Sequence, residues 1–387
     1  AAAAAAPQGL LAACAVWAGA ALARGLHGRR RRASRRGAFL RRIATARAAG
    51  GDGQEAPEDD EEEENFSLVD MLIARSRSVT EMGVTAAEWH REVYEGEIPD
   101  GYAKALQGGI ELVDVLVGTT DLKMIADANS SLDVSPRYCM RLTPRPTFGL
   151  GMLMGATARS FSVLGPLEAS LKRLGASSVD TLVLHGTGGR LSFPAWVYDA
   201  VADAYQQGLC TKVGVSHAGA KPAALKKVAE ELQRRGVALS CALVRLSLLD
   251  RGSLPLIQEC RNLGIQTVFA VETLGPDELA SGRFTAANPT GGEISVPRFT
   301  LTQLLPLRPL HEALGSVAAR VRAREPEKEG IDTTAVALQW CVSKGASPLV
   351  DVGEESNAKA LVACSGWQLL DDEVEVLDKA ADQVKKP

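Results

Sequence analysis

This chain of 387 residues has few aromatic residues (5%) and lacks both closely paired cysteines and the glycine fingerprint of a dinucleotide-binding site. Its seven Cys are an odd number and include no Cys-x-x-Cys pair, which argues against a disulfide framework or a zinc cluster. Residues 149–155 have one residue too many for G-x-G-x-x-G, so an open dinucleotide-binding sheet is not supported. Apolar residues make up 46% and charged residues 23%, which excludes wholly disordered, collagenous and multi-span membrane proteins.

Acidic residues are missing from one end of the chain. Residues 1–50 contain ten Arg and no acid, and the remainder carries 33 basic against 47 acidic residues, a net charge of −14. A body with this charge does not attract nucleic acid, so we exclude nucleic acid as a partner of the folded part.

The first 65 residues are predicted to lie outside the folded domain. An apolar run at 10–23 precedes a basic segment at 29–42, which is typical of a targeting presequence over 1–50 and resembles leaders for plastids bounded by extra membranes. Two alternatives stay open: a membrane anchor at 1–23, and a nuclear signal or solvated basic tail. Residues 51–65 carry nine acids and are expected to form a disordered acidic linker.

Strand and helix patterns alternate through the rest of the chain. Short β-branched runs separated by helical stretches of about a dozen residues predict a parallel sheet with crossover helices. We expect strands at 110–117, 138–142, 181–184, 212–215, 239–246, 266–271 and 348–352. Helices are expected at 102–107, 166–174, 195–207, 223–235, 256–263, 302–323 and 334–343. Seven or eight such units predict an α/β fold, a (β/α)₈ TIM barrel over residues 66–387, with chemistry at the carboxyl ends of its strands.

Several segments of this barrel resemble the aldo-keto reductase family, in particular the plastid aldo-keto reductases of plants. They are GPLEASLKRLGASSVDTLVLHG (165–186), AVADAYQQGLCTKVGVSHAG (200–219), SLLDRG (247–252), TTAVALQWCVSKGASPL (333–349) and SGWQLLDDEVEVLDKAA (365–381). The similarity extends from about residue 82 to 382. It implies a barrel that reduces carbonyls with NADPH through an Asp-Tyr-Lys-His set.

Two of the four catalytic positions implied by the resemblance are substituted. Matching the family's motifs places the Asp at Asp114 and the carbonyl-orienting His at His185. The proton-donating Tyr falls on Thr119, whose hydroxyl is a far weaker acid than a phenol with a pKa of about 10. The Lys falls on Arg141, which keeps the charge but not the geometry of an ammonium.

The cofactor positions implied by the resemblance are also altered. Ser216 keeps the residue that contacts the nicotinamide amide, but His217 replaces an Asn, and Ala242 and Leu243 stand where Ser-Asn-Gln is usual. In the segments where the family contacts the phosphates of NADPH, this chain has the acidic residues Glu272, Asp351 and Glu354, and it has Asn357 where the family has the longer Gln. Carboxylates near a dianionic phosphate repel it, so we expect weakened NADPH binding.

Three hypotheses follow for the function. The first is a pseudoenzyme with no cofactor, a structural or scaffold subunit in a plastid whose partners are other protein subunits, including those of a membrane-associated complex. The second is an NADPH-dependent aldo/keto oxidoreductase with an altered tetrad and a small-molecule substrate. The third is a protein that binds a different small ligand in the cleft where the family binds its cofactor. The acidic residues Glu272, Asp351 and Glu354 would favour a cation as this ligand.

Overall fold

The structure, a computed structural model, describes residues 81–89, 98–144, 163–186, 191–216, 221–291, 297 and 299–384. All of them belong to the compact unit formed by residues 75–387. The predicted presequence and acidic linker lie outside the described residues. Within the described ranges, no helix combines the length and the apolar character needed to cross a bilayer.

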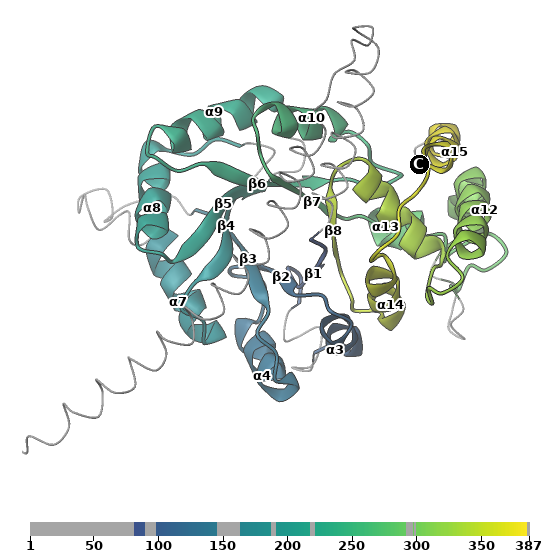
Figure 1. Cartoon of the computed structure of the whole chain (residues 1–387), viewed down its shortest axis with the longest axis horizontal. Helices are drawn as coiled ribbons and strands as arrows, with labels where there is room; N and C mark the ends of the chain where they lie inside the picture. Colours follow the sequence, from purple (N-terminus) through teal and green to yellow (C-terminus); the bar gives the residue numbers. More distant parts are fainter. Residues whose placement is uncertain are drawn as a thin grey trace, which may run out of the picture. The chain divides into compact units, whose positions relative to one another are not determined.

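Eight parallel strands form a closed barrel in which each strand pairs with its neighbours in chain order (Figure 1). The predicted α/β class and (β/α)₈ barrel are therefore confirmed, and the seven predicted strands end within two residues of their observed limits. The strands are β1 (Gly83–Thr85), β2 (Leu112–Leu116), β3 (Arg137–Leu142), β4 (Val179–His185), β5 (Cys210–Ser216), β6 (Leu239–Arg245), β7 (Thr267–Val271) and β8 (Ser347–Val350). The sequence patterns did not predict β1, because it has only three residues.

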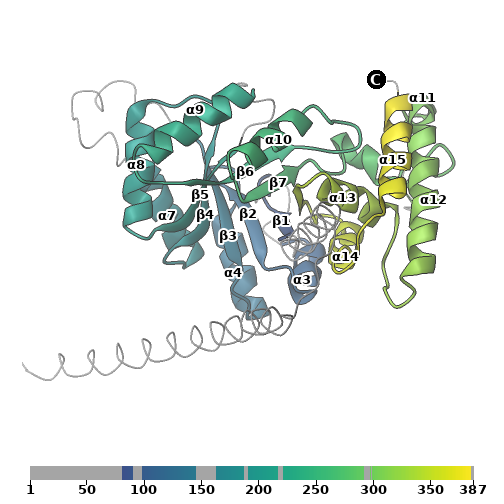
Figure 2. The same ribbon diagram turned by 45° about the horizontal axis from the view of Figure 1, so that its top comes forward.

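Helices surround the barrel and cover the outer face of its strands (Figure 2). Those before β5 are α3 (Asp100–Gln107), α4 (Leu122–Leu132), α7 (Gly165–Leu174) and α8 (Ala195–Gln206). Those after it are α9 (Pro222–Gln233), α10 (Leu254–Asn262), α13 (Thr333–Ser343), α14 (Glu355–Ala363) and α15 (Asp371–Gln383). No helix was predicted at α4, α14 or α15.

The helix predicted at 302–323 is broken in the structure. It consists of α11 (Leu301–Leu304), the 3₁₀ turn η3 (Leu305–Leu307) and α12 (Arg308–Arg324). Pro306 and Pro309 lie at the break, and because proline has no N–H and clashes with the preceding turn, it interrupts a continuous helix.

The inner face of the barrel is apolar at mid-height and polar at its carboxyl end. Side chains alternate between the two faces of a strand, so residues two positions apart share the inner face. One buried cluster fills the middle of the barrel and consists of Leu112, Cys139, Val183, Cys241, Leu243, Phe269 and Leu349. Two residues further along their strands lie Asp114, Arg141, His185, Arg245, Val271 and Asp351, at the end where barrel enzymes place their chemistry.

Ion pairs link the first residues of several strands at the opposite, amino-terminal end of the barrel. Arg137 pairs with Glu81 and lies 4.0 Å from Asp180. Lys212 lies 3.2 Å from Asp180 and 4.0 Å from Glu81. These pairs connect residues at the start of β1, β3, β4 and β5, so they hold the strand ends in register away from the functional end.

Close backbone packing fixes the segment after β8. Gly101 on α3 approaches it so closely that a Cβ there would lie 2.2 Å from the carbonyl oxygen of Val352. A second contact fixes the 3₁₀ turn η2 (Pro276–Ser281), because Nε2 of the buried His311 on α12 donates to the carbonyl of Leu279 at 3.0 Å. Both segments border the functional end of the barrel, so these contacts shape its rim.

Candidate functional site

A cavity of about 720 Å³ opens at the carboxyl ends of the strands. This volume is in the range of small-molecule sites, and the location is the one that barrel enzymes use. Side chains from strands β1 to β8 and from the segments that follow them line the cavity. The polar lining residues at the strand ends are Thr85, Arg141, His185, Ser216, Arg245 and Asp351.

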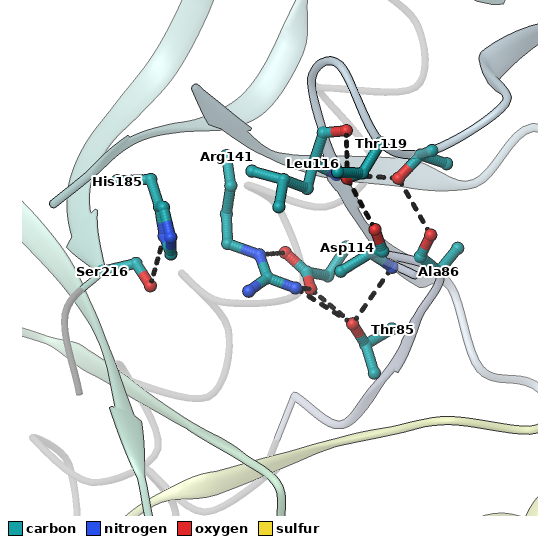
Figure 3. Close-up of polar contacts among 10 residues, drawn as sticks. Thr85, Ala86, Asp114, Leu116, Thr119, Arg141, His185 and Ser216 are labelled. Atoms are coloured by element: carbon teal, nitrogen blue, oxygen red, sulfur yellow. Dashed lines mark hydrogen bonds and ion pairs between the residues drawn. The ribbon is translucent and has the colours of Figure 1, made fainter. Parts of the chain in front are cut away.

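A buried ion pair between neighbouring strands forms the floor of this site. The Nε and Nη2 atoms of Arg141 donate to the two carboxylate oxygens of Asp114 at 2.9 and 2.5 Å. The Thr85 hydroxyl donates to the same carboxylate at 2.7 Å and accepts from Arg141 at 3.2 Å (Figure 3). Asp114 is fully buried and only 9% of the Arg141 side chain is exposed. The fork geometry of a guanidinium therefore satisfies both oxygens of Asp114.

His185 and Ser216 face each other across β4 and β5. Their Cα atoms are partners in the strand register, and Nδ1 of His185 lies 3.2 Å from the Ser216 hydroxyl oxygen. Both residues line the cavity together with Arg141. Five of the predicted site residues line this cavity: Arg141, His185, Ser216, Glu272 and Asn357. Asp114 reaches it through its ion pair with Arg141.

Thr119, like Asp114, does not line the cavity. Its hydroxyl donates to the carbonyls of Ala87 at 2.7 Å and Leu116 at 3.1 Å. Figure 3 shows Thr119 beside Leu116, on the far side of Asp114 from His185 and Ser216. At this position the chain therefore offers no acidic hydroxyl that points toward His185.

Carboxylates dominate the rim of the cavity. Glu88, Glu272, Asp277, Glu278 and Asp351 all line it. Glu272 has a positive φ of 54°, and its carboxylate pairs with Nε of Arg245 at 2.9 Å across the ends of β6 and β7. No group of three metal-ligating side chains occurs among the residues that the structure describes, although the rim is acidic.

The Asp351 carboxyl is tied to the chain on one side of the rim. It accepts from the Trp89 indole N–H at 3.2 Å and from the Gly353 N–H at 2.8 Å. Trp89 is fully buried and packs edge-on against Tyr102, with ring centroids 5.5 Å apart. Burial raises the pKa of the Asp351 carboxyl, and the negative charges of Glu88 and Glu354 raise it further.

The sequence profile described as "Aldo/keto reductase family" matches residues 153–382. This match covers more than half of the chain and includes the strands that carry His185, Ser216 and Arg245. The chain belongs to the aldo/keto reductase family.

One curated relative and several solved structures extend this assignment. The chloroplastic pyridoxal reductase of Arabidopsis thaliana is 33% identical over 194 residues, which are 49% of this chain and 49% of that protein. The chain therefore spans about half the length of this curated relative. The glycerol dehydrogenase from Gluconobacter oxydans is 16% identical with a TM-score of 0.57, covering 79% of this chain and 93% of that one. An aldo-keto reductase of Bombyx mori, solved in complex with NADP, is 16% identical with a TM-score of 0.54, covering 77% and 88%. These two structures show that the fold is shared.

The family's nicotinamide positions are only partly polar in this chain. Ser216 is 4% exposed and keeps a hydroxyl at the cavity wall. Leu243 is 1% exposed and belongs to the apolar cluster inside the barrel, and Ala242 packs into the main core. His217 lies outside the described residues. Neither described β6 side chain can form a hydrogen bond with a carboxamide.

The family's phosphate positions are engaged within the protein. The Arg283 guanidinium lies 3.3 Å from Glu354 and 3.2 Å from Glu278, and it donates to the Ser356 hydroxyl at 2.7 Å. Asn357 donates to Glu278 at 2.6 Å and to the Asp351 carbonyl at 3.1 Å. The expected repulsion by Glu354 is therefore moderated by Arg283, whose charge is already shared between two carboxylates. The described phosphate positions Glu354 and Asn357 are therefore each engaged in an internal contact.

Sequence reasoning missed Arg283 and the acid Glu88. Arg283 follows η2 in an irregular stretch, where no periodic pattern gives its direction. Glu88 lies in the segment after β1, a strand that the sequence patterns did not predict. The number of carboxylates in the segment after β7 could have indicated that a cation was needed there.

Proposed function

We propose that this aldo/keto reductase barrel is a pseudoenzyme that serves as a structural or scaffold subunit in a plastid. The observation that carries the proposal is the state of the tetrad positions. Arg141 is committed to Asp114 through two hydrogen bonds, and the Thr119 hydroxyl is committed to backbone carbonyls. Losing a positioned general acid costs about 10²–10⁴ in rate, and the cofactor positions are altered as well.

The plastid location is supported by two separate features. The curated relative from Arabidopsis thaliana is named as chloroplastic, and the Arg-rich, acid-free composition of residues 1–50 is typical of an import sequence. Under this proposal the partners are other protein subunits, including those of a membrane-associated plastid complex. The outer surface of the barrel would then carry the function.

The alternative is an NADPH-dependent reductase with an altered tetrad. It is favoured by Arg141, His185 and Ser216, which line one cavity and supply polar groups that could orient a carbonyl. The relative's name suggests pyridoxal as the first aldehyde to try.

Steady-state assays of the full chain distinguish the two functions. NADPH absorbance is followed with pyridoxal and with a small reactive aldehyde, using wild type and His185→Ala. We expect no consumption above the enzyme-free rate for either protein. Consumption by wild type that disappears in His185→Ala would replace the pseudoenzyme proposal by the altered-tetrad reductase. Size-exclusion chromatography of the native protein tests the scaffold role. Elution at the mass of a single chain, rather than in a larger complex, would contradict it.

A further inference from the structure

A nearly buried guanidinium presents an unused donor to the cavity. Two of the three nitrogens of Arg141 bind Asp114 and Thr85, and within the described part of the chain Nη1 has no partner. Arg141 is 8% exposed and lines the cavity. Figure 3 shows this nitrogen directed to the side of the site where His185 and Ser216 lie. Nη1 is not among the fully buried, unpartnered polar atoms of the described residues, so it can be reached from the cavity, and an anionic ligand oxygen there would accept a charge-assisted hydrogen bond.

The opposite wall of the same cavity is acidic. Asp351 follows β8 and Glu88 follows β1, and these two strands are neighbours in the closed barrel. His185 and Ser216 end β4 and β5. In a ring of eight strands taken in chain order, the pair β8–β1 lies across the barrel from β4–β5. The Ser216 hydroxyl therefore faces the acidic side across the cavity, and Arg141 on β3 lies between them, with its Nη2 atom 3.2 Å from the Thr85 hydroxyl of β1.

The charges of the lining residues restrict the ligand. Five carboxylates line the cavity, against the two guanidinium groups of Arg141 and Arg245. A simple anion would bind Nη1 of Arg141 but would be repelled by the excess negative charge. A simple cation would be attracted by the carboxylates but would leave the Arg141 donor unused. A ligand that carries both an anionic oxygen group and an ammonium group satisfies both sides.

We propose that this cavity binds a small amino-carboxylate zwitterion. Its carboxylate accepts hydrogen bonds from Nη1 of Arg141 and the Ser216 hydroxyl, and its ammonium group lies near Asp351 and Glu88. The inference rests on the proposed function in one respect, since the ligand uses the space beside Ser216 that a nicotinamide would need. The barrel then acts as a binding subunit whose ligand replaces the family's cofactor.

Isothermal titration of the full chain with ω-amino acids of increasing length tests this proposal. The probes are glycine, β-alanine, 4-aminobutanoate and 5-aminopentanoate, with butanoate and butylamine as analogues that each lack one charged group. We expect saturable binding of at least one zwitterion. The chain length of the amino acid that binds most tightly then reports the distance between the donor groups and the carboxylates of the cavity. Binding of butanoate and butylamine should be at least tenfold weaker, where tenfold corresponds to about 1.4 kcal/mol.

Two variants locate the ammonium group. Asp351→Asn and Glu88→Gln should each lower the affinity for the most tightly bound zwitterion about tenfold or more. The control Glu329→Gln, in a separate surface groove, should leave this affinity unchanged. Glu88 is exposed and forms no contact on which the described fold depends, so its variant should remain folded. The proposal is overturned if no zwitterion binds, if butylamine binds as tightly as 4-aminobutanoate, or if both variants bind like wild type. NADPH titrated into the same sample distinguishes the two proposals, because NADPH binding contradicts the pseudoenzyme proposal whatever the zwitterions do.

Discussion

Replacing Arg141 by Met should destabilise the barrel strongly. The substitution keeps an unbranched side chain of similar length but removes both guanidinium hydrogen bonds to Asp114. The Asp114 carboxylate, fully buried, would keep one donor, the Thr85 hydroxyl. Breaking a buried ion pair by removing one partner costs about 3–5 kcal/mol. We therefore expect the free energy of unfolding to fall by that amount.

Urea denaturation of the full chain, followed by tryptophan fluorescence, measures this loss. The matched control is Lys123→Met, which removes the ion pair with Asp127, where the two side chains are 72% and 66% exposed. An exposed helical pair contributes about 0.3–0.5 kcal/mol. Both variants remove the cation of an ion pair. The difference between their losses in free energy of unfolding therefore measures how much more the buried Arg141–Asp114 pair matters than an exposed pair.

The double variant Asp114→Leu/Arg141→Met separates pairing from packing. Replacing both members of a buried pair by apolar residues of similar volume is often neutral or stabilising, so it should regain most of the stability lost in Arg141→Met. The reasoning is refuted if Arg141→Met costs no more than Lys123→Met. It is also refuted if the double variant is less stable than the single one.

Two further predictions concern packing and pH. Gly101→Ala should lower the thermal unfolding midpoint, because its Cβ would lie 2.2 Å from the Val352 carbonyl oxygen. Gly315→Ala, inside α12 with no atom within 4 Å of the new Cβ, should instead stabilise by about 1 kcal/mol. Burial lowers the pKa of His311 below 6.5, so the unfolded chain binds the proton more readily, and stability should fall as pH decreases from 7 through 6.5 toward the folded-state pKa. His311→Gln should flatten this part of the stability curve, and an unchanged curve would contradict the assignment.

The barrel could be predicted from the sequence because each buried parallel strand is a short run of apolar residues. Seven of the eight strands were visible in this way. β1 is too short to show such a run, and α4 (LKMIADANSSL) is too polar to read clearly as an amphipathic helix. The break between α11 and α12 was missed although Pro306 and Pro309 mark it, because the surrounding pattern is helical.

The site was predictable in position but not in its internal contacts. Asp114, Arg141, His185 and Ser216 could be placed because the resemblance to the family assigns them, and the register of the parallel strands brings them together. The direction of the Thr119 hydroxyl depends on the turn after β2, which a sequence pattern does not specify. The pairing of Glu354 with Arg283 joins residues 71 positions apart and comes from segments outside the strands. Such contacts depend on the closed barrel as a whole.

NADPH titrated calorimetrically into the full chain at low ionic strength tests the pseudoenzyme proposal most directly. Low salt favours the attraction between phosphates and any free cation, so these conditions give NADPH its best opportunity to bind. We predict no saturable heat, because Arg283 is shared between two carboxylates and Leu243 is apolar. A dissociation constant in the micromolar range, about −8 kcal/mol of binding free energy, would contradict the proposal.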